Sequence, residues 1–290
     1  MLGRLFGRSS TKSAREATAA ESDGAGHLAR VERLIALAPP EDRDSVRALL
    51  RPAAVSHGTS GRPAAVDSYI GGHPYLPAGR EWPLDEDGRP MHFVLQVNFA
   101  AVPQLPDFPG EGLLQFFVRD HETWGLTFAE LMGREGFHCR WYAASDLDAA
   151  TSPDPSSPVP PAQVRPSPVE HPGPWPFAFE LLELLPSAYE QMESERAANP
   201  RGFAAYEALW EEHEEVAEAA SEGGEVQVGG WSAFLQGAPD APEGCSPRLI
   251  LGLASAGGMM WGDVGTAHLF GDPAALARGD VSDFWWEWSH

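Results

Sequence analysis

Apolar residues recur at helical spacing near the start of the chain, and prolines mark where this pattern ends. Four of them share one face of a predicted helix: Leu28, Val31, Leu34 and Ile35. Pro39-Pro40 stops that helix, because proline cannot continue it. A second short helix is predicted from Asp42 to Leu50 and ends before Pro52.

From about residue 53 the pattern changes to short apolar or alternating runs bounded by turn residues, which predict β-strands. Near-continuous apolar runs are typical of strands that are buried on both faces. The predicted strands cover residues 93–99, 112–118, 137–142, 177–185, 248–253 and 265–270. In a last strand near the end of the chain, Phe284, Trp286 and Trp288 lie on one face, with Trp285 and Glu287 on the other.

Two stretches depart from this β pattern between residues 151 and 221. Residues 151–176 contain ten prolines, which predict a semi-rigid connector with no room for a helix or a central strand. Residues 203–221 predict a helix whose acidic face carries Glu211, Glu212, Glu214, Glu215 and Glu218. That face is either a grip for a basic partner or a solvated helix surface. Further on, Asp272-Pro273 followed by Gly279 predicts a short capped helix.

Two β-rich stretches follow the same order of features. Gly72 precedes Gln96 by 24 residues, and Gly112 follows 16 residues later. Gly230 precedes Gly252 by 22 residues, and Gly265 follows 13 residues later. The order predicts a duplicated β-rich unit, with chance similarity as the alternative. We expect two sheets packed as a pseudo-twofold pair, with any cleft between them lined by the turns after Gly71-Gly72 and Gly229-Gly230.

The predicted fold is therefore α+β, with mixed or antiparallel β-sheets from two duplicated units, N-terminal helices and an inserted acidic helix. Residues 1–25 form a disordered basic tail and residues 26–52 a helical lead-in. The main domain spans residues 53–290. Within it, residues 53–150 form the first half, residues 151–176 the connector and residues 177–290 the second half.

Charge narrows the classes of partner. The formal net charge is −22, from 42 acidic and 20 basic residues. Such a field repels nucleic-acid phosphates and anionic lipid, so we expect neither a nucleic acid nor a membrane as a partner. We expect a cationic protein as a partner instead. The tail carries no apolar run of signal-peptide length, and nothing approaches the ~20 apolar residues of a membrane span. Cys139 and Cys245 form no CxxC motif. We expect a cytoplasmic protein without a metal or other cofactor.

Several spaced motifs resemble one family. They are Gly71-Gly72-x-Pro74-Tyr75-Leu76-Pro77, Glu81-Trp82-Pro83, Gly88-x-Pro90, Gln96-x-Asn98, 112–117 and Trp261-Gly262-Asp263-x-Gly265. Together they resemble the YwqG-like family, catalogued as domain of unknown function 1963, over roughly residues 50–290. The resemblance implies an α+β fold and a bacterial cytoplasmic protein. The chain departs from the family pattern at Gly252, where a glutamine-bearing strand is usual, and at Trp231.

The candidate ligand-binding residues come from these motifs: Gly72, Tyr75, Trp82, Gln96, Trp261 and Asp263. Asp263 is either a site carboxylate or part of an Asx turn. The tryptophans either line a groove or belong to the core. Asp85-Glu86-Asp87-Gly88 is similar to the start of a calcium loop, but a hairpin turn is favoured because later acidic ligands are missing.

No catalytic constellation is visible. The histidines are scattered, no Gly-x-Ser-x-Gly elbow occurs, and no HExxH or HxH spacing supports a metal site. The leading prediction is a non-enzymatic protein-interaction module for a cationic partner, of which an immunity or adaptor role against a basic toxin is one form. The alternatives are a small-molecule or metal-dependent enzyme with its site between the two halves, and a structural component of a larger assembly.

Overall fold

The structure is a computed structural model. It describes residues 24–124, 126, 132–133, 136–160, 167–169, 173–187, 191–221 and 223–290. The predicted basic tail therefore lies outside the described residues, apart from its last two positions. Part of the proline-rich connector lies outside them as well.

The described strands form one sheet in which every pairing is antiparallel. The strands are β1 (Arg51–Gly58), β2 (Tyr69–Ile70), β3 (His92–Asn98), β4 (Leu113–Val118), β5 (Met132–Gly133), β6 (Phe137–Tyr142), β7 (Trp175–Leu184), β8 (Val226–Gly229), β9 (Leu249–Ala254), β10 (Thr266–Phe270) and β11 (Trp285–Ser289). Their order across the sheet is β5-β11-β10-β9-β8-β1-β7-β2-β3-β4-β6.

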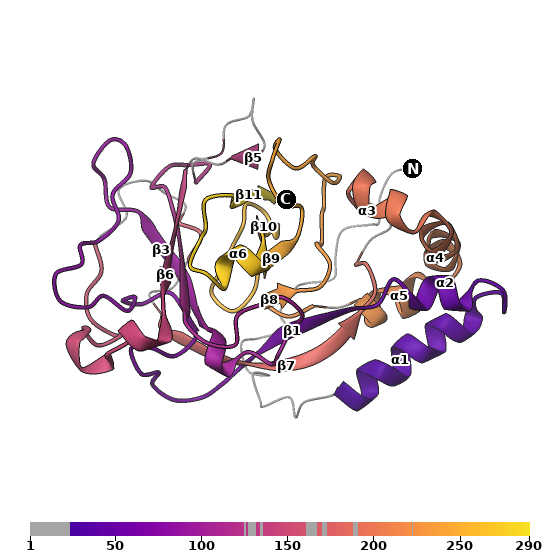
Figure 1. Ribbon diagram of the computed structural model, residues 1–290, viewed down its shortest axis with the longest axis horizontal. Helices are drawn as coiled ribbons and strands as arrows, with labels where there is room; N and C mark the ends of the chain where they lie inside the picture. The colour runs from indigo at the N-terminus through magenta and orange to yellow at the C-terminus, as the bar shows by residue number, and fades with distance from the viewer. Residues whose placement is uncertain are drawn as a thin grey trace, which may run out of the picture.

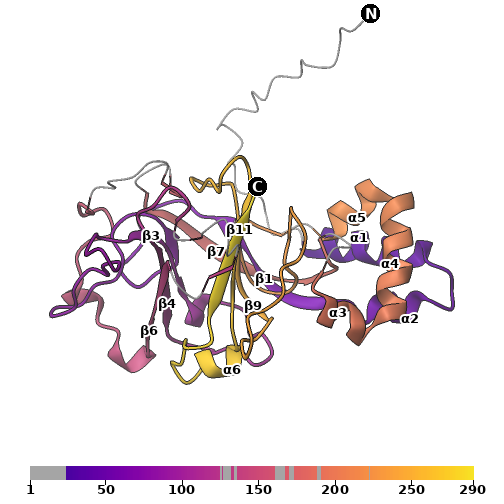
Figure 2. The same ribbon diagram turned by 90° about the horizontal axis from the view of Figure 1, so that it is seen from above.

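The helices gather mostly at one end of the molecule. They are α1 (Gly24–Leu37), α2 (Arg43–Arg47), α3 (Glu193–Ala198), α4 (Pro200–Glu212), α5 (Glu214–Ser221) and α6 (Pro273–Leu276). Helices α1 to α5 lie beside one end of β1 and β7, far from β3, β4 and β6, whereas α6 lies among the C-terminal strands (Figures 1 and 2).

A long central ladder joins the two halves. β1 and β7 pair along eight positions, from Arg51 opposite Leu184 to Gly58 opposite Phe177. On its other side, β1 pairs with β8, a strand of the second half. β7 likewise pairs on its other side with β2, a strand of the first half. This ladder corrects the prediction of two separate sheets. The two halves form one continuous sheet because β1 and β7 supply the hydrogen bonds between them.

The sheet curls until its distant strands meet over a shared interior. Phe116 of β4 and Trp286 of β11 pack with ring centroids 5.9 Å apart, although many strands separate them in the sheet order. Both rings belong to the same buried cluster as Ala54 of β1. The result is a nearly closed, barrel-like sheet, and burial of aromatic side chains of this size dominates the energetics of such an interior.

The opposite face of the central ladder carries the helices. Ala53 and Val55 of β1 pack with Val31 and Leu34 of α1, while Ala54 faces the interior. Side chains alternate across a strand, and each face of β1 is covered by a different apolar cluster. Both faces of β1 are therefore apolar.

Several local predictions are confirmed. Asp272 caps α6 through its side chain, with Pro273 in the first turn. Phe284 and Trp286 face the interior, whereas Trp285 belongs to a cluster on the other face. The Asp85–Gly88 turn closes through a hydrogen bond from Gly88 N to Asp85 O at 3.0 Å, with Gly88 at φ +76°.

Other local predictions are wrong. β7 begins at Trp175 and includes Pro176, within the stretch that was predicted to exclude a central strand. The Pro176 carbonyl accepts from Thr59 N at 3.0 Å, so this residue still contributes one bond to the ladder although it has no N–H. The helix predicted over 203–221 is two helices, separated at His213, whose φ of −139° and ψ of 41° are not helical.

Candidate functional site

Three of the predicted site residues lie together in the first half. The Gln96 side chain of β3 is fully buried. Its Oε1 accepts from Tyr75 N at 2.9 Å, and its Nε2 donates to the carbonyls of Ala65 and Asp67 at 2.9 and 2.8 Å. Gln115 of β4 donates from Nε2 to Tyr75 O at 2.8 Å. The two amides thus hold the segment after Gly72 across the outer face of the sheet.

Gly72 is required by backbone geometry. Its φ is +70°, and a Cβ there would lie 2.6 Å from the carbonyl oxygen of Pro155 and 2.9 Å from Cβ of Pro174. Tyr75 is fully buried, and its ring packs edge-on against Tyr142 with centroids 5.0 Å apart. Neither Tyr75 nor Gln96 is exposed to solvent.

The other three predicted residues are dispersed. Trp82 packs edge-on against His73 and Phe117 and donates from Nε1 to Met91 O at 2.8 Å. Trp261 is buried in the interior against Trp124, with ring centroids 5.3 Å apart. Asp263 is exposed on the turn before β10. The structure therefore does not bring the six residues into one pocket, and their role in ligand binding stays a prediction.

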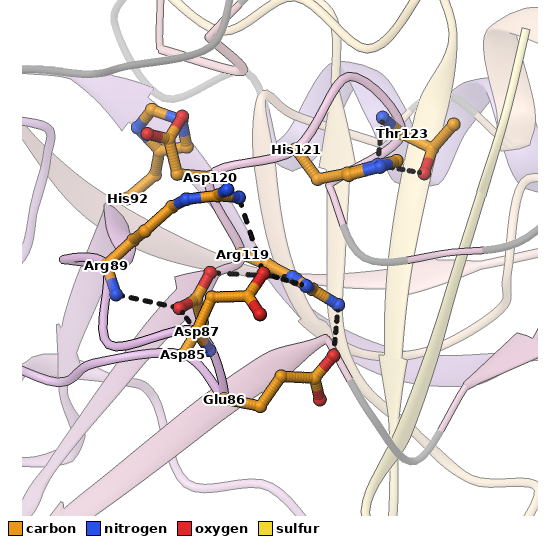
Figure 3. A network of polar contacts seen from close by, with 9 residues as sticks. All are labelled: Asp85, Glu86, Asp87, Arg89, His92, Arg119, Asp120, His121 and Thr123. Carbon is orange, nitrogen blue, oxygen red and sulfur yellow. Dashed lines mark hydrogen bonds and ion pairs between the residues drawn. The ribbon is translucent and has the colours of Figure 1, made fainter.

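A polar network ties the Asp85 turn to the end of β4 (Figure 3). Asp85 Oδ1 accepts from the backbone of Asp87 and Arg89 at 3.0 and 2.8 Å. The Arg119 guanidinium contacts Glu86 at 2.6 Å and Asp87 at 2.8 Å. These acidic groups already hold an arginine and backbone N–H groups. The contacts therefore support the hairpin-turn interpretation of this segment.

Gln96 belongs to a row of residues that lie opposite one another on neighbouring strands, and the second half has a similar row. In the first half the cross-strand partners are Tyr69, Gln96, Gln115 and Arg140. In the second half they are Gln227, Gly252, His268 and Glu287. Each row runs across four neighbouring strands, and each first member lies two residues before a glycine pair with positive φ. Gly252 therefore occupies the position of Gln96.

The segment after the second glycine pair crosses its half of the sheet as the Tyr75 segment crosses the first. Gln227 Nε2 donates to Gly229 O at 2.7 Å and to Trp231 O at 2.9 Å. Ala233 N donates to His268 Nε2 at 3.0 Å. A histidine here replaces the glutamine amide that binds Tyr75 in the first half.

His268 is positioned as a structural residue. Its ring is buried, and Nδ1 contacts the Glu287 carboxylate. Since Nε2 accepts from Ala233 N, the ring proton belongs on Nδ1 and points to Glu287. Both ring nitrogens are engaged, so this ring has no free nitrogen to act as a general base.

A hollow opens over Gly252, where the first half has the Gln96 side chain. We call this hollow of about 100 Å³ the chamber; Gly252, Gln227, His268, Thr266 and Ser221 are among its lining residues. A Cβ built on Gly252 would meet its nearest neighbour only at 3.5 Å, so the position has room for a side chain that the sequence does not supply.

The chamber presents hydrogen-bond acceptors. The hydroxyls of Ser187, Ser221 and Thr266 each donate their one proton to a backbone carbonyl. The accepting oxygens belong to Ser232, Ala217 and Ala233, at 3.1, 3.0 and 2.9 Å. Only hydroxyl lone pairs remain for a ligand. Both amide protons of Gln227 are likewise used, which leaves Oε1 as an acceptor.

A larger hollow adjoins the chamber at the surface. We call it the mouth; it measures about 450 Å³ and is lined by Ser187, Glu215, Glu218, Ala219, Ser221 and Gly223. It shares Ser187, Ser221 and Gly223 with the chamber. Glu215 and Glu218 are exposed on α5, three residues apart and therefore on one helix face. Arg30 of α1 donates from Nε to Ala219 O at 3.3 Å, which fixes α1 against this wall.

A separate groove of about 520 Å³ lies between α2, α3 and α4. Arg51 stacks over the Trp231 ring, 3.3 Å from its centroid, and binds Glu195 Oε1 at 2.6 Å. Burial raises the pKa of the Glu195 carboxyl, and Arg51 opposes that rise. These charged groups are paired with each other, so the groove offers a ligand less than the mouth and chamber do.

Metal ligands and the Cys139 thiol are two further candidate groups among the described residues. No three His, Cys, Asp or Glu side chains gather there in a way that could hold a metal ion. Burial strongly raises the pKa of the Cys139 thiol, which keeps it in the unreactive protonated form.

Sequence reasoning missed the residues that make the chamber. Gln227 carried no visible signal because β8 was not predicted, and His268 was noted only as one of several scattered histidines. The available signal was the replacement of a glutamine by Gly252, together with the acidic face of residues 211–218. Matching the two halves by their cross-strand partners shows that Gly252 replaces Gln96, and the chamber and mouth bring Gly252 and the acidic face near each other.

Comparison with protein families gives one result. A family model described as "Domain of unknown function (DUF1963)" matches residues 68–289. The match confirms the resemblance to domain of unknown function 1963 that the glycine, proline and tryptophan motifs indicated. A comparison with curated proteins found no match. Among the helices of the described residues, none combines the length and apolar character needed to cross a bilayer.

Proposed function

The chain belongs to the DUF1963 family, and we propose that it is a non-enzymatic binding module for a cationic protein partner. The observation that carries this proposal is the mouth, a hollow flanked by Glu215 and Glu218 that continues into an acceptor-lined chamber. A protein that recognises a basic segment needs such a combination of negative charge and depth.

Long-range charge supports the same partner. Glu211, Glu212, Glu214, Glu215 and Glu218 are all exposed. Within a chain of net charge −22, this local excess attracts cations and speeds their encounter. An immunity or adaptor protein that binds a basic partner in the bacterial cytoplasm is the form of this function that we propose.

Charge-neutral variants of the mouth test the proposal. The probe is a short fluorescein-labelled peptide of alternating lysine and glycine, titrated against the full chain by fluorescence anisotropy. Exposed charge pairs contribute about 0.2–1 kcal/mol each, so the double variant Glu215→Gln/Glu218→Gln is expected to weaken binding by about tenfold. Glu211→Gln/Glu212→Gln makes the same change of charge outside the mouth and is expected to cost about threefold or less.

Salt provides a second measurement of the same claim. Binding through exposed carboxylates weakens when the ionic strength rises toward ~0.5 M, because the Debye length falls below the separation of the charges. Absence of peptide binding at low salt, or binding that high salt leaves unchanged, would contradict the proposal. Equal losses for the two double variants would show that the mouth has no special role.

We also propose that the two halves, residues 53–150 and 177–290, arose by duplication of one β-rich unit within a main domain that begins near residue 53. The matching strand orders β2-β3-β4-β6 and β8-β9-β10-β11 support this origin, as do the two hydrogen-bonded rows. An experimental structure in which superposed halves separated Gln96 from Gly252 would contradict it.

A further inference from the structure

The chamber occupies the volume that a side chain fills in the other half of the molecule. In the first half, the Gln96 side chain fills the corresponding volume, and its two amide N–H groups donate to the carbonyls of Ala65 and Asp67. Gly252, its counterpart by cross-strand pairing, supplies no donor. The chamber therefore lacks a hydrogen-bond donor at the place where the first half has one.

The remaining walls favour a ligand that donates. Ser187, Ser221 and Thr266 have committed their protons to backbone carbonyls. Gln227 Oε1 points toward Gly223, since a Cβ built on Gly223 would lie 2.5 Å from it. A primary ammonium has three donors and no acceptor, which complements this set.

The shape of the donor group distinguishes the two cationic side chains. Lysine presents a compact ammonium whose three donors can turn toward separate acceptors, such as the hydroxyls that line this hollow of about 100 Å³. An arginine guanidinium presents a rigid planar fork that matches a carboxylate, and no carboxylate is among the described residues that line the chamber. Trp231 and Leu253, which also line the chamber, offer apolar surface to the lysine stem.

Charge favours the same ligand and disfavours anions. A buried ammonium needs a nearby negative charge, and Glu215 and Glu218 flank the mouth through which it would enter. A phosphate or carboxylate would be repelled by Glu215 and Glu218 and would meet the lone pairs of the chamber hydroxyls.

We propose that the chamber over Gly252 is a specificity pocket that receives the ammonium group of a lysine side chain from the cationic partner. This inference rests on the proposed function and identifies which residue of the partner is read. The mouth supplies attraction for any cation, and the chamber selects lysine over arginine.

Refilling the chamber tests the proposal without removing any charge. Gly252→Gln restores the residue type of the first half, and the space around Gly252 accepts a Cβ. Gly58→Gln is the matched control, because Gly58 is exposed and a Cβ there meets nothing within 4 Å. The probes are the lysine–glycine peptide, its arginine–glycine counterpart and n-butylammonium as a competitor. Melting temperatures verify that each variant is folded.

The expected result is selective. Gly252→Gln weakens the lysine peptide by about tenfold or more, because hydrogen bonds to a charged group are lost, and leaves the arginine peptide within about twofold. Gly58→Gln changes neither. Equal binding of the lysine peptide to Gly252→Gln and to the unaltered chain would refute the chamber as a lysine pocket. It would leave the proposed role of the mouth in cation binding intact. If the unaltered chain bound none of the cationic probes, the proposed function would be refuted as well. n-Butylammonium binding as tightly as the peptide would show that the site takes a free amine instead of a lysine side chain.

Discussion

Gln96 and Gly252 occupy equivalent positions in the two halves of one sheet. Gln96 lies between Tyr69 and Gln115 in its row, and Gly252 lies between Gln227 and His268 in the other. The first position carries a buried, fully engaged amide, whereas the second carries no side chain and borders a hollow. The first half is thus filled by its own side chain at this position, and the second half has a hollow there.

Gln96 is expected to be structurally indispensable in the first half. Gln96→Leu leaves Tyr75 N without its acceptor and the carbonyls of Ala65 and Asp67 without their donor. Unpaired buried groups cost about 1–3 kcal/mol each, so we expect a loss of about 3 kcal/mol or more in urea unfolding. Gln104 is exposed and its Nε2 donates to Leu105 O at 3.0 Å, so Gln104→Leu should lose only about 1 kcal/mol. Comparable losses for the two variants would contradict this role.

The first glycine pair is expected to be intolerant of side chains. Gly72→Ala combines a positive φ with a clash against Pro155 O, and we expect a loss of about 2–4 kcal/mol. Gly79 has φ +84° but nothing within 4 Å of a Cβ, so Gly79→Ala should lose only about 1 kcal/mol. Thermal melts of both variants measure the difference. A Gly72→Ala variant as stable as Gly79→Ala would show that the close approach to Pro155 is not needed.

His138 is expected to make stability depend on pH. Burial and the neighbouring Arg140 lower the pKa of its imidazole, and Arg140 Nε donates to His138 Nε2 at 3.3 Å. A lowered folded pKa gives stability that is complete above the unfolded value of about 6.5 and is lost as the pH falls through the folded value. Urea unfolding of His138→Gln should therefore lose less stability between pH 7.5 and pH 5 than the unaltered chain does. Identical pH slopes would refute this.

Arg51 is expected to stabilise the groove by pairing with Glu195. Burial raises the pKa of Glu195 and Arg51 lowers it, so Arg51→Leu leaves a carboxyl whose folded pKa is raised further above its unfolded value. Such a group keeps its stabilising contribution at low pH and loses it as the pH rises through the folded value.

The cost of Arg51→Leu, about 2 kcal/mol near pH 8, should therefore shrink toward pH 5. The second substitution Glu195→Gln should restore much of the loss, because it removes the unpaired charge. A penalty that is independent of pH, and is not relieved by Glu195→Gln, would show that packing over Trp231 is the larger effect.

The elements read most accurately from sequence were those with strong local signals. The apolar runs around Val94 and Leu114 predicted buried strands, and Asp272-Pro273 predicted a capped helix, because these features depend on near neighbours in the chain. The central ladder was not predicted. The pairing of β1 with β7 joins segments more than a hundred residues apart, and Pro176 concealed the start of β7.

The candidate site was predictable only in outline. The acidic face of residues 211–218 and the unusual Gly252 were visible in the sequence. Their proximity depends on α5 ending beside the second row, and the break at His213 sets the position of that end. Trp261 and Asp263 illustrate the opposite case, because these motif residues are only two positions apart in sequence but lie in the interior and on the surface respectively.

The most direct test of the account is backbone amide chemical shifts of the ¹⁵N-labelled chain during titration with the lysine–glycine peptide. A lysine ammonium in the chamber should cause the largest changes at Gly252, Gly224 and Ala233, smaller changes along α5, and none at Gln96. Changes confined to the exposed amides of α5, with Gly252 and Ala233 unmoved at saturation, would contradict it.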